Sequence, residues 1–522
     1  MPSGPTTFII AGGDHGGVID SLVDLGFRFE EPVGGFVTVL DTFDGRLHRA
    51  GMRLTVLEGA VLELTLGGAG IVEVHLQPTS RPRFASDLPR GPFRSRIASI
   101  TDIRALLPQL HVSATRTVGV RRDGEGRSVA NVLLYEQIAL AGAGGVDAVE
   151  ASADGLPGAV IEVHEVIGSR KPARRATEAL AQHGLERFDG DALELLARAA
   201  GVDLGGFNAA ATVLLDPSMP AAEGIRAVLA NLADSIEANW QGTIDHLDPE
   251  FLHDLRIAVR RTRAVITQTK AALPPDVVTE AGDGFAWLGG LTGPARDLDV
   301  YLIEWDDYVR PLGAAATAAL IPVRDLLAQR QAAAHAALDT AMTSPAAATL
   351  MATWRRMLAA IPTHEQPGPH AERALGRVVR QRLTRAQTKL IERGRLIQPD
   401  TPAEKVHDLR KDAKKLRYLL ECFAGLLADA PRKKFVKRLK ALQDNLGEHQ
   451  DAEVHVALIR EIAVDLHDGA ASTDTLLALG QLTERLEQIR IAARAEFAEQ
   501  FAAYDTTATE HAFAAMLDFL DS

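Results

Sequence analysis

The sequence contains one cysteine, few aromatic residues and no long hydrophobic run. Because a disulfide needs two thiols, the lone Cys422 excludes an intramolecular disulfide. It lies among apolar residues of a predicted helix, so we expect a buried thiol that behaves as a small hydrophobic side chain. No stretch approaches the roughly 18 apolar residues of a membrane helix. Residues 1–5 lack the basic and apolar regions of a secretory signal, so we expect a cytoplasmic protein with no membrane partner.

Charge is abundant and unevenly distributed. The formal net charge is −13, yet residues 371–440 hold 20 Lys and Arg against 8 Asp and Glu. An acidic body with a basic insert favours a confined polyanion site over a protein that coats anions with its whole surface. An ordinary solvated helix surface is the alternative. A chain of 522 residues also exceeds the size of one hydrophobic core, so we expect about two to four domains.

Residues 1–200 combine short strands with a few helices. Six runs are β-branched or alternating and are bounded by turn residues, as expected of antiparallel strands: 36–40, 61–66, 71–76, 115–121, 128–137 and 159–166. Asp123-Gly124 is a hairpin signal between two of them. The segments 171–184 and 191–200 have helical spacing. The pattern predicts an antiparallel sheet or barrel, followed by a glycine- and proline-rich join at 201–220.

From residue 221 on, the sequence is rich in Ala, Leu, Arg and Glu with a 3.6-residue hydrophobic period. Proline and glycine divide it into about eight to ten helices. Two predicted helix starts, 248–250 and 401–404, each combine an oxygen cap, a proline in the first turn and an acid near the positive end of the dipole. The sequence therefore predicts an α+β chain in two parts, with an all-helical C-terminal part.

One basic stretch of the helical part occurs twice. The run His-Asp-Leu-Arg begins at residue 253 and returns at residue 407, 154 positions later. The same offset carries Gly293 onto Gly447, Asp297 onto Asp451 and Val300 onto Val454. This is an internal duplication, and two homologous bundles related by a pseudo-two-fold axis are its simplest structure.

Each copy places basic side chains on one helical face. With spacings of i, i+3, i+7 and i+10, the first copy aligns His253, Arg256, Arg260 and Arg263, and Arg261 belongs to the same run. The second copy aligns His407, Arg410, Lys414 and Arg417, broadened by Lys411 and Lys415. Like charges at this spacing cost about 0.2–0.5 kcal/mol per pair in an isolated helix. Either acidic partners or an anionic ligand should offset that cost.

Two further basic runs flank the second copy. In residues 431–440, Lys433, Lys437 and Lys440 share one helical face, opposite an apolar face that includes Phe435. In residues 373–389, the charges are spread more evenly around the helix, so an ordinary surface explains them equally well.

A polymer with many phosphates fits these faces best. Contacts from Lys and Arg to phosphate are charge-assisted, and neutralising several phosphates on one chain releases condensed counterions. Sites for single-stranded nucleic acid normally supply aromatic platforms, whereas Tyr418 is the only aromatic residue within the repeated runs. Inorganic polyphosphate is therefore favoured over RNA or DNA, which stay alternatives.

The two histidines have two interpretations. A helical histidine is more often a hydrogen-bonded structural group than a ligand, but two equivalent copies beside arginines favour a phosphate contact. We expect no metal site, because Asp254 and Asp408 are the only other ligand types at suitable spacing and point away from the histidine face. No catalytic residue and no cofactor is predicted.

The repeated residues resemble a known family. Asp-Pro-Glu-x-x-His-Asp-Leu-Arg-x-x-x-Arg-Arg-x-Arg at 248–263 and Leu-x-x-Leu-x-Gly-x-x-Arg-Asp-Leu-Asp-Val at 288–300 are similar to motifs of the conserved-histidine α-helical (CHAD) domain. The resemblance implies paired four-helix bundles around a basic channel for long-chain polyphosphate, often in proteins of polyphosphate granules. By motif, the repeated His, Arg and Lys residues line that channel. Gln450 replaces the Arg296 of the first copy, so the halves need not bind equally.

The N-terminal part resembles the CYTH, or triphosphate-tunnel, family. Residues 41–51 are similar to its second-strand signature, and 161–164 to a late strand. Active members open with a Glu-x-Glu-x-Lys strand that binds metal and triphosphate, whereas residues 7–11 contain no acid. Metal-assisted phosphoryl chemistry needs carboxylates to hold the cation. The acids that are present do not rebuild such a site: Glu73, Glu162 and Glu165. The resemblance thus implies a β-barrel that has lost catalysis.

We therefore expect a CYTH-like β-barrel at 1–205, a linker at 206–218 and a duplicated helical domain at 219–522, with copies at about 219–345 and 370–520. The expected function is binding of long-chain polyphosphate, with polyphosphate granules as a candidate location. An enzyme is less favoured. The alternatives are a metal-dependent tripolyphosphatase in the N-terminal tunnel and a nucleic-acid or protein scaffold, and the sequence does not predict an oligomeric state.

Overall fold

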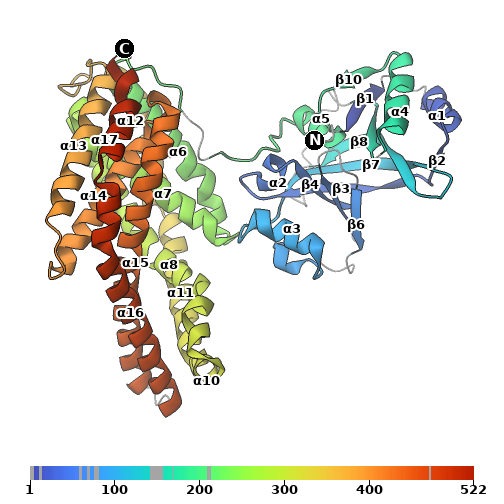
Figure 1. Cartoon of the computed structure of the whole chain (residues 1–522). Coiled ribbons are helices and arrows are strands. Elements are labelled where there is room, and N and C mark those ends of the chain that lie inside the picture. Colours follow the sequence, from blue (N-terminus) through green and yellow to red (C-terminus); the bar gives the residue numbers. More distant parts are fainter. Residues whose placement is uncertain are drawn as a thin grey trace. The chain divides into compact units, whose positions relative to one another are not determined.

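The computed structural model describes residues 5–10, 15–57, 61–66, 71–75, 81–141, 157–166, 169–208, 213–468 and 472–521. The chain divides into two compact units, Met1–Ala209 and Ala210–Ser522. An antiparallel sheet builds most of the first unit and helices build the second (Figure 1). This confirms the predicted α+β chain in two parts.

The N-terminal unit is organised around one ten-stranded sheet. Its strands are β1 (Thr6–Ile10), β2 (Phe27–Phe29), β3 (Val33–Asp41), β4 (Met52–Leu57), β5 (Val61–Leu66), β6 (Ile71–His75), β7 (Leu107–Arg122), β8 (Ser128–Ala141), β9 (Ala159–Glu165) and β10 (Glu186–Phe188). The order is β10-β1-β9-β8-β7-β3-β4-β5-β6, with β2 beside β7. The helices of this unit are α1 (His15–Asp24), α2 (Arg46–Arg49), α3 (Pro92–Thr101), α4 (Arg170–Gln182) and α5 (Ala192–Ala199).

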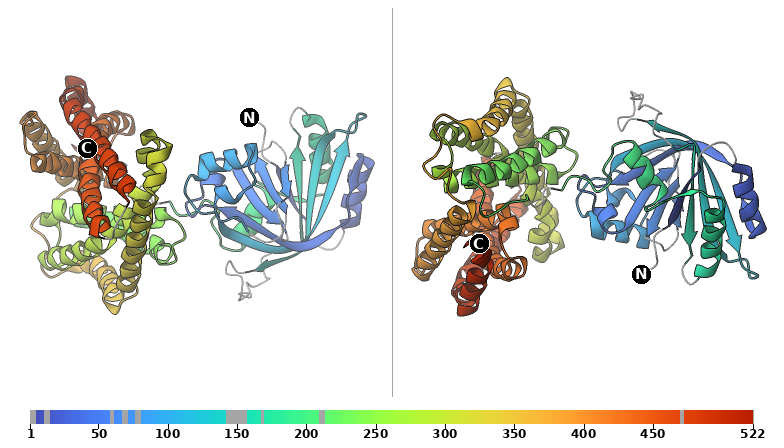
Figure 2. Two further views of the ribbon diagram at one scale, coloured as in Figure 1. Left: turned by 90° about the horizontal axis from the view of Figure 1, so that it is seen from below. Right: turned by 90° about the horizontal axis from the view of Figure 1, so that it is seen from above.

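The predicted closed barrel is wrong, because the sheet is open. Within the described residues, β6 and β10 end the strand order and do not pair, and Figure 2 shows a curved, open layer. Helices bury both of its faces: Leu134 of β8 packs with α1 and α4, and its neighbour Leu133 packs with α5. Alternation along a strand identifies buried faces, but it does not decide whether the first and last strands meet.

The local predictions in this unit fared better. Each of the six predicted strands lies within or overlaps a strand of the structure, and residue 76 falls outside the described residues. The hairpin between β7 and β8 is present, with Asp123 N donating to Arg127 O at 2.9 Å. Its left-handed residue is Gly126, with φ 81°, rather than Gly124.

The helical unit consists of twelve described α-helices: α6 (Ala221–Ile244), α7 (Pro249–Thr269), α8 (Pro275–Ile303), α9 (Trp305–Val309), α10 (Ala314–Ala319), α11 (Ile321–Met342), α12 (Pro345–Ala360), α13 (Leu375–Arg395), α14 (Ala403–Cys422), α15 (Asp429–Asp468), α16 (Thr473–Tyr504) and α17 (Thr507–Leu517). The first residues of α6, α7 and α8 return 154 positions later as the first residues of α13, α14 and α15. We call these two sets copy one and copy two. One continuous core buries apolar residues of both.

A reciprocal exchange of backbone hydrogen bonds marks the symmetry between the copies. Ala221 N donates to Arg373 O at 2.8 Å, and Leu375 N donates to Met219 O at 2.9 Å. Each residue in one bond is 154 positions from its counterpart in the other. A second such pair joins Ala222 N to Ala371 O and Gly376 N to Pro217 O. A two-fold axis requires this pattern, in which i contacts j and the mate of j contacts the mate of i.

The copies differ at their far ends. Helix α15 is continuous over 40 residues, whereas α8 ends at Ile303 and the chain continues through the short α9 and α10. The broken segment packs Tyr301 and Trp305 against Val456 and Ile459 of α15. The copies therefore pack against each other at this end as well as along their shared core.

The starts of α7 and α14 also differ. Asp248 Oδ1 accepts hydrogen bonds from the backbone N–H groups of Glu250 at 2.9 Å and Phe251 at 3.3 Å, as predicted. The predicted cap at Thr401 is wrong, because Pro402 occupies the N-cap position of α14 and its side chain makes no capping bond. Thr401 Oγ1 instead accepts from Gln398 N at 2.8 Å. The proline stands one residue earlier, relative to the helix start, than Pro249 does in copy one.

Candidate functional site

Helices α7 and α14 pack against each other, and their histidine-led faces open onto a cleft of about 640 Å³. Six pairs of equivalent residues line it, each pair 154 positions apart: His253 and His407, Arg256 and Arg410, Arg260 and Lys414, Arg296 and Gln450, Asp297 and Asp451, and Val300 and Val454. Because both members of each pair face the same space, the cleft follows the pseudo-two-fold axis. It holds the first three positions of each predicted basic face.

The amphipathic spacing of these helices explains the arrangement. Leu252, Leu255 and Val259 of α7 are buried in the shared core, as are Val406, Leu409 and Ala413 of α14. Positions i, i+3 and i+7 on the opposite side are thereby directed away from the core. Two such faces, brought together by α7 and α14, concentrate cationic side chains along one line.

Equivalent ion pairs flank the cleft. Arg256 Nη2 lies 3.4 Å from Asp297 Oδ1, and Arg410 Nη2 lies 2.9 Å from Asp451 Oδ1. The aspartates are 63% and 56% exposed, so solvent weakens both pairs. Burial is the main cause that lowers the pKa of Arg256, while Asp297 opposes the shift and Arg260 adds to it.

The central cations of the cleft are Arg260 and Lys414, which are mates across the axis. In the part of the chain that the structure describes, neither forms an ion pair within 4 Å. Burial, together with the nearby Arg260 and Arg410, lowers the pKa of Lys414 to about 7, against the opposing effect of Asp451. A desolvated cation among other cations is costly in isolation, and an anion in the cleft would relieve that cost.

The pair at positions 296 and 450 is where the copies diverge within the cleft. Arg296 Nη1 donates to Pro249 O at 3.3 Å, and its Nη2 lies 3.9 Å from Glu250 Oε1. Gln450 Oε1 instead forms a hydrogen bond with Nδ1 of His407. Copy one thus adds a cation where copy two has a neutral amide.

Comparison with known proteins identifies the helical part. Residues 227–460 match the family model of the CHAD domain. The chain contains a CHAD domain. Two solved structures are similar to it. The CHAD domain from the plant Ricinus communis is 28% identical, with 56% of this chain and 95% of that chain covered and a TM-score of 0.47. PptA from Streptomyces chartreusis is 19% identical, with 54% and 99% covered and a TM-score of 0.45. No curated protein matched the sequence.

The other predicted residues of the CHAD domain lie outside the cleft lining: Arg261, Arg263, Lys411, Lys415, Arg417, Lys433, Lys437 and Lys440. Arg261 and Arg417 both contact Glu421, at 2.6 and 2.7 Å. The first of these pairs joins α7 to α14, and the second lies within α14. Arg263 is exposed one turn beyond the central pair. Lys411 lies 3.1 Å from Asp408, and Lys433 lies 2.6 Å from Asp429.

Two polar cleft residues of the CHAD domain were missed. Arg330 of α11 lines the cleft and pairs with Asp465 and, at 3.1 Å, with Glu461. A single arginine in an alanine-rich helix carries no local signal, because only the fold brings α11 to α8. His455 also lines the cleft beside Tyr301, and burial lowers its pKa to about 4. It adjoins the repeated Val454, which could have drawn notice to it.

A cluster of buried ion pairs lies in the interior of the N-terminal unit. The buried Glu162 lies 3.1 Å from His164 Nε2 and 3.6 Å from Arg53 Nη2, and Arg53 also pairs with Asp191. Although burial opposes the shift, His164 and Arg53 lower the pKa of Glu162. Arg53 is thus held by two carboxylates, in contrast to the central cations of the CHAD domain.

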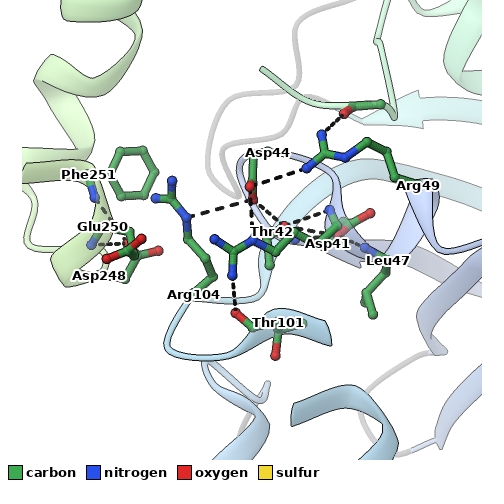
Figure 3. A network of polar contacts seen from close by, with 12 residues as sticks. Asp41, Thr42, Asp44, Leu47, Arg49, Thr101, Arg104, Asp248, Glu250 and Phe251 are labelled. Carbon is green, nitrogen blue, oxygen red and sulfur yellow. Dashed lines mark hydrogen bonds and ion pairs between the residues drawn. The ribbon is translucent and has the colours of Figure 1, made fainter. Parts of the chain in front are cut away.

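The turn at residues 41–51 is likewise held by hydrogen bonds within the unit. The Asp41 carboxylate accepts from the backbone N–H groups of Thr42 at 2.6 Å and Leu47 at 2.9 Å (Figure 3), and from that of His48 at 2.8 Å. It therefore holds the turn of α2. Arg104 Nε lies 3.8 Å from Asp44 Oδ1 in the same network.

The described residues contain no cluster of three His, Cys, Asp or Glu side chains suited to a metal ion, and the side chain of Glu73 lies outside the described set. None of their helices is both long and apolar enough to cross a membrane.

Proposed function

We propose that the chain binds long-chain inorganic polyphosphate in the cleft between the two copies. The observation that carries the proposal is the central pair, Arg260 and Lys414, which have no ion pair among the described residues. Six Lys and Arg side chains line the cleft against two carboxylates. Phosphate groups supply the missing counter-charges and accept charge-assisted hydrogen bonds.

The symmetry of the cleft supports polyphosphate over nucleic acid. An unbranched polyphosphate is the same from either end, so a two-fold axis can pass through the middle of a bound segment. A nucleic acid strand has a direction and offers different groups to two equivalent halves. Among the described residues the cleft lining contains no Phe, Tyr or Trp, whereas sites for single strands usually stack bases on aromatic rings.

A charge-matched pair of variants tests the proposal. Replacing Arg256, Arg260, Arg410 and Lys414 by Ala removes four cations from the cleft, and we expect the affinity for long-chain polyphosphate to fall by at least about 100-fold. The control replaces Arg170, Lys171, Arg174 and Arg175 by Ala. These four are exposed on α4, so the net charge changes equally while the cleft stays intact. Equal losses in both variants would overturn the proposal.

Competition separates polyphosphate from a nucleic-acid scaffold. RNA at equal phosphate concentration should displace bound polyphosphate poorly, because its bases find no aromatic platform in the cleft. RNA that competes as well as unlabelled polyphosphate would favour the scaffold. Such binding would localise the protein to polyphosphate granules.

A metal-dependent tripolyphosphatase in the N-terminal unit is the weaker alternative. It rests on the proposed likeness of residues 41–51 to the CYTH signature. Arg53 pairs with Glu162, and Arg116 lies 2.7 Å from Glu63, so both of these interior arginines already have a carboxylate partner. Phosphate release from tripolyphosphate with Mg²⁺ or Mn²⁺, lost in Glu162→Gln, would support an enzyme.

A further inference from the structure

A second cationic surface lies on copy two, outside the cleft. Lys389 and Arg393 of α13 contact the carboxylate of Asp412 at 2.8 and 2.7 Å, and Lys415 of α14 lies 3.9 Å from it. The Asp412 side chain is 5% exposed, whereas those of the three cations are 43–45% exposed. One buried charge therefore anchors three cations whose outer sides face solvent, and two positive charges are left uncompensated.

The cluster continues along α14. Lys411 Nζ lies 3.1 Å from Asp408 Oδ1. The hydrogen bond from Lys411 lowers the pKa of Asp408, and Arg393 and Lys405 add to the shift, so both lie within its electrostatic reach. We call Lys389, Arg393, Lys405, Lys411 and Lys415 the α13–α14 ridge. Its five cations surround two carboxylates.

Copy one has no counterpart to this ridge. The equivalents of its five cations, 154 positions earlier, are Ser235, Asn239, Phe251, Ile257 and Arg261. Arg261 is the one cation among them, and Glu421 holds it at 2.6 Å. The equivalent of the buried Asp412 is Ala258, which packs in the core of copy one. The shared fold therefore does not require the charges of the ridge.

The ridge begins where the cleft ends. Arg410 and Lys414 line the cleft, and the next residue after each, Lys411 and Lys415, belongs to the ridge. Successive residues differ by about 100° around a helix axis. Helix α14 therefore presents Arg410 and Lys414 to the cleft, and Lys411 and Lys415 to the surface beside the cleft. Helix α13, packed beside α14, extends the cationic surface through Lys389 and Arg393.

We propose that the α13–α14 ridge is a second phosphate-binding subsite, which takes the part of a polyphosphate chain that leaves the cleft over copy two. This inference rests on the proposed function. It adds the side on which the polyphosphate chain leaves the cleft, and a dependence of the affinity on chain length. The cleft-facing stretch from His407 to Lys414 spans about 10 Å of helix at 1.5 Å per residue. A ligand confined to that length fills the cleft alone, and a longer chain reaches the ridge.

Substitution by the residues of copy one at three of four positions gives a conservative test. The ridge variant combines Lys389→Ser, Arg393→Asn and Asp412→Ala, which copy those residues, with Lys411→Ser, which keeps a polar side chain at an exposed position. No buried carboxylate is then left without its partners. The control variant combines Arg170→Ser, Lys171→Asn, Arg174→Ser and Glu178→Ala on the exposed face of α4. Each removes three cations and one acid. Both full-length proteins are titrated with tripolyphosphate and with polyphosphate of about 100 units, a length chosen to extend well beyond the cleft.

The ridge variant should bind the long polymer about tenfold more weakly than the unmodified protein, with tripolyphosphate affinity unchanged within about twofold. Unchanged tripolyphosphate binding also shows that the variant is folded. The control should leave both affinities unchanged. Equal weakening of both ligands, or no weakening of either, overturns the ridge while the cleft proposal stands. Failure of the unmodified protein to bind either ligand overturns both.

Discussion

Copy one and copy two begin their three matched helices 154 residues apart, yet their charges agree only near the axis. There, Arg256 and Arg410 each pair with an equivalent aspartate, and Arg260 faces the same cleft as Lys414. Away from the axis, the cations Lys389 and Arg393 of copy two replace the neutral side chains of copy one. The comparison indicates that the duplication supplies a symmetric central site, and that divergence has given one copy an additional surface.

The largest effect expected from a pair of mates concerns Arg256 and Arg410. Each single change to Ala should weaken polyphosphate binding about tenfold, and the double change about 100-fold, because each removes one phosphate contact of similar strength. Titration of the three variants measures this. If one single change had nearly the whole effect and the other none, the two halves would not bind equivalently.

The lowered pKa of Lys414 predicts that polyphosphate affinity depends on pH, and this dependence distinguishes Lys414 from its mate, Arg260. Its pKa is lowered to about 7, and the phosphate-bound form needs the protonated amine, so affinity should fall about tenfold from pH 6 to pH 8. Lys414→Arg, which copies the residue of copy one, should remove most of this dependence.

The histidines that line the cleft are present in both proteins, so the difference between the two pH profiles isolates Lys414. Identical profiles would contradict the assignment. The stability of the ligand-free protein should depend on pH in the opposite direction. The lysine binds its proton more tightly in the unfolded chain, so the contribution of Lys414 to the free energy of unfolding rises with pH from about 7 to about 10.

A smaller effect is expected at the position where the copies differ inside the cleft. Gln450→Arg gives copy two the residue of copy one, and should raise polyphosphate affinity by about threefold through one additional cationic contact. Arg296→Gln should lower it by a similar factor. Titration with tripolyphosphate as well as the long polymer checks that both changes act in the cleft. A rise in affinity from Arg296→Gln would show that this arginine hinders binding.

The smallest effect concerns stability alone. Asp248→Ala removes the side-chain cap of α7 and should lower the free energy of unfolding by about 1 kcal/mol. Pro402→Ala, at the equivalent position of α14, removes no capping bond and should have a smaller effect. Denaturant unfolding measures both. Equal losses would mean that the Asp248 cap contributes little.

The repeat was accessible from sequence because identical residues at a fixed offset need no knowledge of tertiary structure. It placed the first three basic positions of each copy on a common face, and the structure brings those faces to one cleft. The spacing alone did not separate Arg260 from Arg261, because Glu421 reaches Arg261 only through the packing of α7 against α14. The pair of Arg417 with Glu421 lies within α14, where the i, i+4 spacing could have indicated it.

Two failures of prediction were non-local. Alternation along the strands identified the sheet, but its closure depended on β6 and β10, which are far apart in sequence and do not pair in the described residues. Arg330 lines the cleft only because α11 packs against α8, and the sequence did not predict that contact. The wrong cap was a local error. Pro249 is the first residue of α7, whereas Pro402 stands one residue before α14 and leaves that helix without a side-chain cap. The basic face has the same length in both helices.

The most direct test of the symmetric cleft is the salt dependence of polyphosphate binding, measured for the unmodified protein and for the variant with Ala at 256, 260, 410 and 414. The logarithm of the association constant should fall linearly with the logarithm of salt concentration. Its slope should be shallower by roughly 3 in the variant, since each phosphate contact contributes about 0.7 for single-stranded polymers. Binding that is absent, insensitive to salt, or of equal slope in both proteins would contradict the account.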